Sequence, residues 1–269
     1  MKYISLFIAF VFALNTLAQD FTLADFYNYN PELERRIDEQ FSYMNDTLRV
    51  GQLIVPAVGK HGKPTEHVVK LMQQGKVGGV LLLNGTVESF TAFVNQFDSI
   101  CKAHGYLPPI YSADAEPTLI KYKIKGSTPV PKTNAIKTKE KVKEVSNTIS
   151  ADLNKIGITQ NFAPVIDASP NKTVSNRSFG LAMDTVIGFS NIFIEETQRN
   201  GIVATAKHFP GHGFVVGDTH EKLVFIDGEM KEVPNYQPVI DKGVLSIMVA
   251  HIAVKNNEKY NTEGLPSTC

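Results

Sequence analysis

Apolar positions along the chain follow a recurring pattern, in which an amphipathic segment ends at a glycine and a short apolar run follows. In the clearest case, five apolar residues between 142 and 156 recur three or four apart, which is typical of one helix face. Gly157 ends that helix, and residues 158–165 then predict a strand. The pattern predicts six strands in all, at 52–58, 79–84, 109–114, 158–165, 202–207 and 244–250.

Helices are expected between these strands. The most regular are 65–74, 86–104, the segment ending at 156, and 184–200, where Asp184 is the expected N-cap. The strands are short and apolar on both faces, as in parallel sheets covered by helices, so the alternation predicts an α/β fold. Segment 115–137 holds three prolines and several lysines and is expected to be a long loop at the rim of a site.

Two α/β architectures fit this alternation, a doubly wound sheet and a (β/α)₈ barrel. Neither G-x-G-x-x-G nor G-x-x-x-x-G-K-[ST] occurs, which weakens the case for a nucleotide-binding open sheet. Barrel enzymes collect their polar site residues at the carboxyl ends of many strands, whereas open sheets bind mainly at one switch point. Polar residues end nearly every predicted strand, which favours the barrel: Asn84, Asp114, Asp167, Lys207, His208 and His251.

Composition narrows the class of function. The chain carries 27 basic and 27 acidic residues, and 43% of its residues are hydrophobic, as in ordinary globular proteins. It lacks the basic excess of a nucleic-acid-binding protein. After the N-terminal segment no run of 18 uncharged apolar residues occurs, so no membrane span is expected in the mature chain.

The first 18 residues have the pattern of a secretory signal peptide. Lys2 precedes an apolar run from Ile4 to Leu14, and small residues stand before Gln19. We expect cleavage after residue 18, one domain at 19–269, and export to the periplasm or the extracellular space. An uncleaved anchor is the alternative. Two cysteines, Cys101 and Cys269, do not form a disulfide scaffold.

The densest group of candidate catalytic residues lies near the fifth predicted strand. Four of the seven histidines fall between 208 and 251. The segment KHFPGHG at 207–213, whose proline and glycines exclude a helix, is followed by GDTH at 217–220. Asp218 stands two residues before His220 and can orient its imidazole and stabilise the imidazolium, which makes the pair a candidate proton shuttle.

Other interpretations of these histidines remain open. They can serve only to satisfy hydrogen bonds of the loop, or they can form a metal site with His208, His212, Asp218 and His220 as ligands. Because His208 and His212 cannot share a helical face, and because Lys207 would place a cation beside the metal, we expect neither a metal nor another cofactor.

The segment 207–213 with its GDTH continuation resembles the signature of family 3 glycoside hydrolases, and in particular of their bacterial β-N-acetylglucosaminidase branch. Further segments resemble the family in the same order along the chain: GQLIVPAV at 51–58, VGGVLLLNG at 77–85, PPIYSADAE at 108–116, NFAPVIDAS at 161–169, NRSFG at 176–180, SIMVAHI at 246–252 and LPSTC at 265–269. The resemblance implies a (β/α)₈ barrel and retaining hydrolysis of a β-linked N-acetylglucosamine.

The resemblance also implies individual roles. His220 would be the general acid/base on a mobile loop, supported by Asp218. Asp114 would bond sugar hydroxyls, and three further residues would hold the sugar and its acetamido group: Arg177, Lys207 and His208.

The sequence departs from the family after Glu116. The family continues with Gly-Gly-x-Val-x-Arg, but residues 117–122 read PTLIKY, so Tyr122 stands where the family has an arginine that grips the sugar. Lys121 or Lys123 can substitute only as point charges, without the bidentate fork of a guanidinium.

A second departure concerns the nucleophile. Retaining glycosidases need a nucleophilic carboxylate roughly 5 Å from the acid/base group. In this family it is an aspartate on the seventh strand, and the chain ends at Cys269, before that strand. We therefore expect about six of the eight βα units and no nucleophile in the chain as given. An incomplete barrel exposes two strand edges, which favours self-association.

The leading hypothesis is an exported β-N-acetylhexosaminidase that acts on a small carbohydrate, such as a short glycan or a peptidoglycan fragment. One alternative is a non-catalytic sugar-binding protein, and another is a metal-dependent hydrolase that uses the histidine cluster. A third is a phosphorylase, because a histidine acid/base does not repel an attacking phosphate as a carboxylate would.

Overall fold

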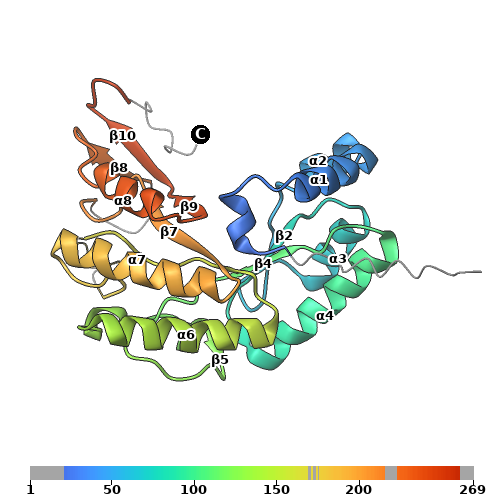
Figure 1. The fold of residues 1–269 in the computed structure, drawn as a ribbon, viewed down its shortest axis with the longest axis horizontal. Helices are drawn as coiled ribbons and strands as arrows, with labels where there is room; N and C mark the ends of the chain where they lie inside the picture. The colour runs from blue at the N-terminus through green and yellow to red at the C-terminus, as the bar shows by residue number, and fades with distance from the viewer. Residues whose placement is uncertain (1–20, 169–170, 172–173, 175, 216–222, 261–269) are drawn as a thin grey trace, which may run out of the picture.

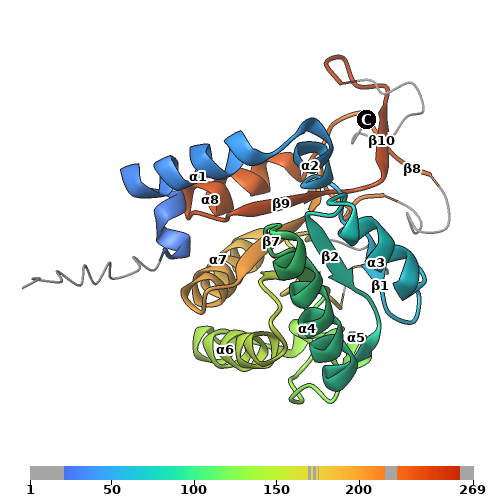
Figure 2. The same ribbon diagram turned by 90° about the vertical axis from the view of Figure 1, so that its right-hand side faces the viewer.

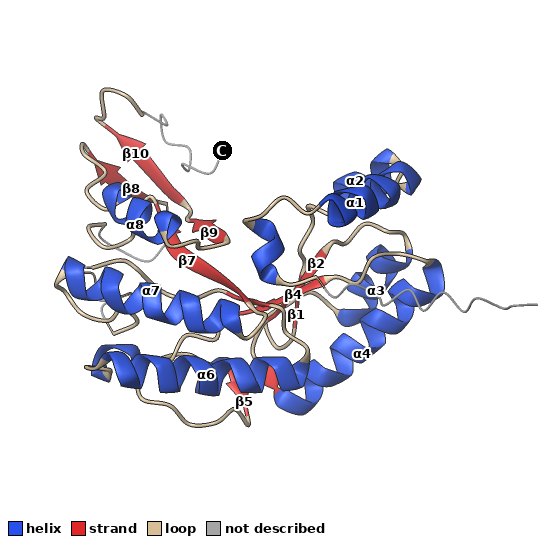
Figure 3. Ribbon diagram, viewed as in Figure 1, coloured by secondary structure: helices blue, strands red, loops and turns tan. Residues whose placement is uncertain are grey.

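Among the residues that the structure describes, the central sheet has six strands, all parallel and in chain order (Figures 1 and 3). The computed structural model describes residues 21–168, 171, 174, 176–215 and 223–260. The strands are β1 (Ala57–Val58), β2 (Gly79–Leu82), β4 (Ile110–Ala113), β6 (Gln160–Asn161), β7 (Val203–Phe209) and β9 (Ser246–Val249). In a doubly wound sheet the strand order reverses at a switch point, and in this sheet it does not. The arrangement confirms an α/β fold of the (β/α)₈ type, represented by six consecutive strands.

Helices connect successive strands, as the periodicity predicted. They are α3 (Thr65–Gln73), α4 (Val87–His104), α6 (Lys139–Ile156), α7 (Met183–Arg199) and α8 (Tyr236–Asp241). Figures 1 and 2 both show α6 and α7 side by side along the sheet, with α4 on the other side of α6. Among the described residues, no helix combines the length and apolar character that crossing a bilayer requires.

Local sequence signals set the ends of the long helices. A capping box formed by Thr86 and Ser89 begins α4, and the Thr138 side chain caps α6. Gly157 ends α6 in the left-handed region, at a φ of 94° that favours glycine. The expected N-cap of α7 is wrong by two residues. Ala182 occupies the cap, and Asp184 lies in the first turn, where its charge complements the helix dipole.

Two apolar clusters cover the sheet. The larger lies between the first strands and α3, α4 and α6, and it includes Val80, Phe90 and Ile149. The smaller packs α7 and α8 against β7, and it includes Ile166, Val186, Ala204, Tyr236 and Val239. Together the clusters fix the carboxyl ends of β4, β6 and β7 relative to one another.

The first strand is shorter than predicted. The helix α2 (Asp46–Gly51) and a turn at 52–53 precede β1, and Ile54 and Val55 lie between this turn and the strand, outside any helix or strand. These two side chains are 46% and 50% exposed, so the apolar run at 52–56 does not belong to the strand.

The connection at 115–137 is also more ordered than the loop that its prolines predicted. It contains α5 (Ile120–Lys123), β5 (Ile124–Lys125), which pairs with β3 (Gly85–Thr86), and the 3₁₀ turn η2 (Thr133–Ala135). Three isoleucines of this connection are fully buried and anchor it to the core: Ile120, Ile124 and Ile136.

Elements at the edge of the sheet were not predicted. β8 (Val224–Asp227) and β10 (Ile252–Lys255) form a separate parallel pair, visible near the C-terminus in Figure 1. The N-terminal part adds the 3₁₀ turn η1 (Leu23–Phe26) and α1 (Pro31–Tyr43). A further 3₁₀ turn, η3 (Val233–Asn235), leads into α8.

Candidate active site

Charged side chains converge at the carboxyl ends of three neighbouring strands. Asp114 follows β4, Asp167 follows β6, and Lys207 and His208 lie within β7. Arg177 comes from the connection between β6 and α7, where a parallel bridge from Val165 to Ser178 holds the chain beside the sheet. Parallel strands place their carboxyl ends at one edge, and this edge is where barrel enzymes build their sites.

Lys207 lies at the centre of the group. Its Nζ is 2.9 Å from Oδ1 of Asp114 and 2.6 Å from Oε1 of Glu116, and the side chain is 1% exposed. A buried ammonium is tolerated only when carboxylates pair with it. Burial alone would lower the pKa of Lys207, but the carboxylates of Glu116 and Asp114 outweigh burial and raise that pKa above its ordinary value. Lys207 is therefore a fixed positive charge.

Arg177 holds the same glutamate from the other side. Its Nε and Nη2 donate to the two carboxylate oxygens of Glu116 at 2.8 and 2.6 Å, which is the bidentate geometry of a guanidinium on a carboxylate. Although burial would raise the pKa of Glu116, Lys207 and Arg177 lower it to about 2. Glu116 is 1% exposed, whereas the side chains of Arg177 and Asp114 are 14% and 22% exposed. Arg177 and Asp114 therefore face the solvent side of the cluster.

Asp167 orients His208. Its Oδ2 lies 2.7 Å from Nδ1 of His208, and its Oδ1 accepts a hydrogen bond from the backbone N–H of His212 at 2.8 Å. Burial, together with the cations Lys207 and Arg177, holds the pKa of His208 well below its ordinary range. The ring is therefore neutral, with its proton on the nitrogen that faces Asp167. Its Nε2 lies 3.5 Å from Nη2 of Arg177 and keeps a lone pair on the site side.

The structure brings together the four residues assigned to sugar binding, Asp114, Arg177, Lys207 and His208. Their positions are not equivalent, because Lys207 is buried beneath the other three. The two residues assigned to proton transfer, Asp218 and His220, lie outside the described residues.

The two lysines beside Tyr122 differ in their relation to the site. The pKa of Asp114 is lower than its ordinary value. Burial raises it, the Lys207 ammonium lowers it most, and the Lys123 ammonium lowers it further. The Lys121 ammonium lies 4.7 Å from the centre of the Tyr122 ring. Of the two, Lys123 is therefore the cation that acts on the site.

The structure adds three carboxylates to the predicted site residues. Asp167 stands in the motif NFAPVIDAS and is among the polar residues at the ends of predicted strands, whereas Glu116 stands two residues after Asp114 in the motif PPIYSADAE. Glu232 contacts the site from the turn before η3, and no motif of the sequence marks it. Among the described residues, no cluster of three or more His, Cys, Asp or Glu side chains is arranged to hold a metal ion.

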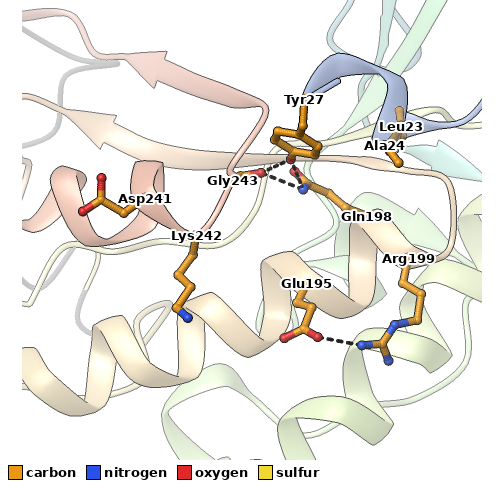
Figure 4. A pocket seen from close by; sticks show the side chains of 9 residues that line it. All are labelled: Leu23, Ala24, Tyr27, Glu195, Gln198, Arg199, Asp241, Lys242 and Gly243. Atoms are coloured by element: carbon orange, nitrogen blue, oxygen red, sulfur yellow. Dashed lines mark hydrogen bonds and ion pairs between the residues drawn. The ribbon is translucent and has the colours of Figure 1, made fainter. Parts of the chain in front are cut away.

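A separate surface cavity of about 470 Å³ lies at the opposite end of the sheet (Figure 4). The Tyr27 hydroxyl and the Gln198 side chain both donate to the carbonyl of Gly243, which precedes β9. The Tyr27 bond attaches the end of η1 to the amino end of the sheet, and the Gln198 bond attaches α7 to the same carbonyl. The cavity is not part of the site.

The comparisons with known proteins agree on one family. Residues 47–267 match the glycosyl hydrolase family 3 N-terminal domain. The beta-hexosaminidase LpqI of Mycobacterium tuberculosis is 30% identical over 189 residues, which cover 66% of this chain and 48% of LpqI. A beta-hexosaminidase of Methylobacillus flagellatus is 25% identical over 221 residues, which cover 76% of this chain and 62% of the relative. The chain thus spans about half the length of LpqI.

Solved structures show the same fold. The glycoside hydrolase family 3 beta-N-acetylglucosaminidase of Paenibacillus sp. str. FPU-7 superposes with a TM-score of 0.73 at 25% identity. The match covers 84% of this chain and 45% of the Paenibacillus chain.

Proposed function

Because the chain belongs to glycosyl hydrolase family 3, whose N-terminal domain it matches over residues 47–267, we propose that it is a glycoside hydrolase that removes β-linked N-acetylglucosamine. The names of its relatives, beta-hexosaminidase and beta-N-acetylglucosaminidase, support this substrate class. A short glycan or a peptidoglycan fragment is the proposed source of the sugar.

The charged cluster around Lys207 is the observation that carries the proposal. Two carboxylates and two cations balance one another, and Glu116 fixes both cations, so the partly exposed groups of Asp114 and Arg177 are held in place. Asp114 accepts hydrogen bonds from sugar hydroxyls, while Arg177 donates to hydroxyl or acetamido oxygens. His208 presents its Nε2 lone pair to the same space. A neutral, rigid set of donors and acceptors suits an uncharged sugar.

The proton-transfer role is assigned to His220, supported by Asp218. The loop that leads to them begins at 207–213, a segment that is anchored by the bond from His212 N–H to Asp167. Among the described carboxylates of the cluster, Asp114, Glu116 and Asp167 are each held by cations or donors. None of the three is therefore assigned as the nucleophile.

That engagement of all three carboxylates favours one alternative, in which the site binds the sugar without cleaving its glycosidic bond.

Two further proposals rest on the N-terminal sequence and on the edges of the sheet. Residues 1–18 support export to the periplasm or the extracellular space. β1 and β9 are the outer strands of the described sheet, and pairing through their edges would support self-association.

A hydrolysis assay with 4-nitrophenyl N-acetyl-β-glucosaminide tests the proposal. From the chain as given we expect negligible nitrophenol release, because no nucleophile is assigned in it. Release is expected when a seventh strand that carries the family's aspartate is appended, and His220→Ala should then reduce it at least about 100-fold, as for loss of a general acid/base. His104→Ala, at an exposed histidine of α4, is the matched control and should leave the rate unchanged.

Each alternative predicts a different result. Binding of N-acetylglucosamine without turnover, even with the seventh-strand aspartate appended, would support the non-catalytic protein. Turnover that needs added phosphate would indicate a phosphorylase, and turnover that is abolished by a chelator would indicate a metal-dependent hydrolase.

A further inference from the structure

A buried glutamate outside the predicted site connects two of its loops. Oε1 of Glu232 accepts a hydrogen bond from the backbone N–H of Ala168 at 3.0 Å, and Oε2 accepts one from the backbone N–H of Gly213 at 2.7 Å. The side chain is 3% exposed. Ala168 directly follows Asp167, and Gly213 belongs to the loop that continues towards His220. One carboxylate thus joins the loop after β6 to the loop after β7.

Glu232 is closely packed on both sides, against Gly211 and against the end of β7. A Cβ added at Gly211 would lie 2.5 Å from Cβ and from Oε2 of Glu232, and Gly211 has a φ of 131°. On the other side, Glu232 precedes η3 and α8, and the Tyr236 ring packs edge-on against Phe209 of β7 with centroids 5.1 Å apart. The backbone of Glu232 is therefore tied to the same strand that carries Lys207 and His208.

The contact requires a side chain with two acceptor oxygens. Two buried backbone donors from different loops need two acceptors, and the two oxygens of a glutamate side chain supply both. A glutamine has the same size but one acceptor and one donor, so it can satisfy only one of the two N–H groups. An aspartate keeps both acceptors but is shorter by one methylene group.

We infer that Glu232 is a positioning residue, which sets the distance between the Asp167–His208 pair and the loop that leads to His220. Among the described residues, its hydrogen bonds to the site are to the backbone of these two loops. The effect of Glu232 on sugar binding rests on the proposed function. The contacts of Glu232 with the two loops are tested independently of that function.

The electrostatic interaction between Glu232 and Asp167 provides a second readout. Burial and the neighbouring Asp167 carboxylate raise the pKa of Glu232 to about 7. Besides Glu232, the titratable and charged groups that face Asp167 are His208, His212, Arg177 and Tyr236. Because two nearby carboxylates raise each other's pKa, a neutral side chain at position 232 lowers the pKa of Asp167.

Hydrogen-exchange mass spectrometry on the wild type, Glu232→Gln and Glu196→Gln tests the inference. Glu196 is the matched control, because it is a 4% exposed carboxylate on α7 that is paired with Arg199. In Glu232→Gln, we expect at least tenfold faster exchange in the peptides that contain Ala168 and Gly213. In Glu196→Gln, these peptides should exchange as in the wild type.

Sugar binding is measured on the same variants by calorimetry across pH. We expect Glu232→Gln to weaken N-acetylglucosamine binding at least tenfold and to move the midpoint of its pH dependence to lower pH. A residue that merely filled space would leave this midpoint in place. If Glu232→Gln does not fold, Glu232→Asp carries the same test, because its shorter side chain cannot reach both loops.

Unchanged exchange at both loops in a folded variant would overturn the inference, as would faster exchange with unchanged sugar affinity and midpoint. If the wild type binds no N-acetylglucosamine, the proposed function fails, and the exchange result alone then decides whether Glu232 joins the loops.

Discussion

Nζ of Lys207 lies 2.6 Å from Oε1 of Glu116, and both side chains are 1% exposed. An ion pair this far from water is costly to break, because the remaining partner keeps its charge in a medium that solvates it poorly. The same pair fixes Arg177 and Asp114 at the solvent side of the site, so stability and the proposed sugar recognition depend on one group of contacts.

Replacing Glu116 by Gln should lower the free energy of unfolding by about 3 kcal/mol, at the lower end of the range for breaking a buried pair, because Asp114 still compensates Lys207. Urea denaturation measures the loss. Glu144→Gln is the matched control, since Glu144 also lies 2.6 Å from a lysine, Lys141, but both side chains are exposed. Its loss should stay below about 1 kcal/mol. An equal decrease in the free energy of unfolding in the two variants would show that burial does not make the Lys207–Glu116 pair more important for stability than an exposed pair.

Stability should vary with pH in two opposite ways. The pKa of Glu116 falls from 4.5 to about 2 on folding, so its contribution is present above pH 4.5 and is lost as the pH falls towards 2. Burial raises the pKa of Asp167 from 3.8 and of Glu232 from 4.5, each to about 7. The native state then binds more protons than the unfolded state between these values and pH 7, so stability declines as the pH rises through that window.

We therefore expect the free energy of unfolding to be highest near the ordinary carboxyl pKa of 4.5 and to decrease towards pH 7. Urea denaturation at a series of pH values measures this dependence. Glu232→Gln removes one of the two groups responsible, so its decline should be shallower. A variant curve that runs parallel to the wild type would show that Glu232 does not titrate in this range.

His208 should remain neutral through the physiological range. Nitrogen-15 NMR of histidine-labelled protein should show an uncharged His208 ring between about pH 5 and 8, where ordinary histidines change charge. Above the Asp167 pKa of about 7, where Asp167 is ionised, the ring proton should lie on Nδ1, facing Asp167. Asp167→Asn removes the carboxylate that selects this tautomer, and the Nδ1 signal should change. A His208 that titrates near pH 6.5 in the wild type would refute the assignment.

Gly211→Ala tests how closely the loop of 207–213 approaches Glu232. A methyl group there lies 2.5 Å from Glu232 and needs a φ of 131°, so we expect a loss of about 3 kcal/mol or more. Gly228→Ala is the control for the backbone effect alone. Gly228 has a φ of 81° but nothing within 4 Å of an added Cβ, and its loss should stay near 1 kcal/mol. Thermal unfolding of both variants compares them, and a smaller loss for Gly211→Ala would mean that the loop adjusts.

The sequence predicts the strand order and the long helices well, because these depend on local periodicity and on caps such as Thr86 and Gly157. It fails at 52–56, where a turn and an irregular segment with half-exposed apolar side chains precede β1. It also fails at β8 and β10, whose pairing joins Val224 to Ile252. Such long-range pairing leaves no trace in a short window of sequence.

The site follows the same rule. Asp114, Arg177, Lys207 and His208 lie in motifs, and the strand ends bring them together. Glu232 lies in a turn, 64 residues from Ala168 and 19 from Gly213, and its two hydrogen bonds are to backbone groups. Only the folded chain shows that it belongs to the site.

Calorimetric titration with N-acetylglucosamine is the most direct test of the central claim that the Lys207 cluster recognises this sugar. We expect the wild type to bind it, Arg177→Met to weaken binding at least tenfold through loss of the bidentate guanidinium, and glucose to bind more weakly because it lacks the acetamido group. Arg199→Met is the control, since Arg199 also pairs with a buried glutamate but lies on α7 away from the site. A wild type that does not bind the sugar, or an Arg177→Met variant that binds it as well as Arg199→Met does, would contradict the account.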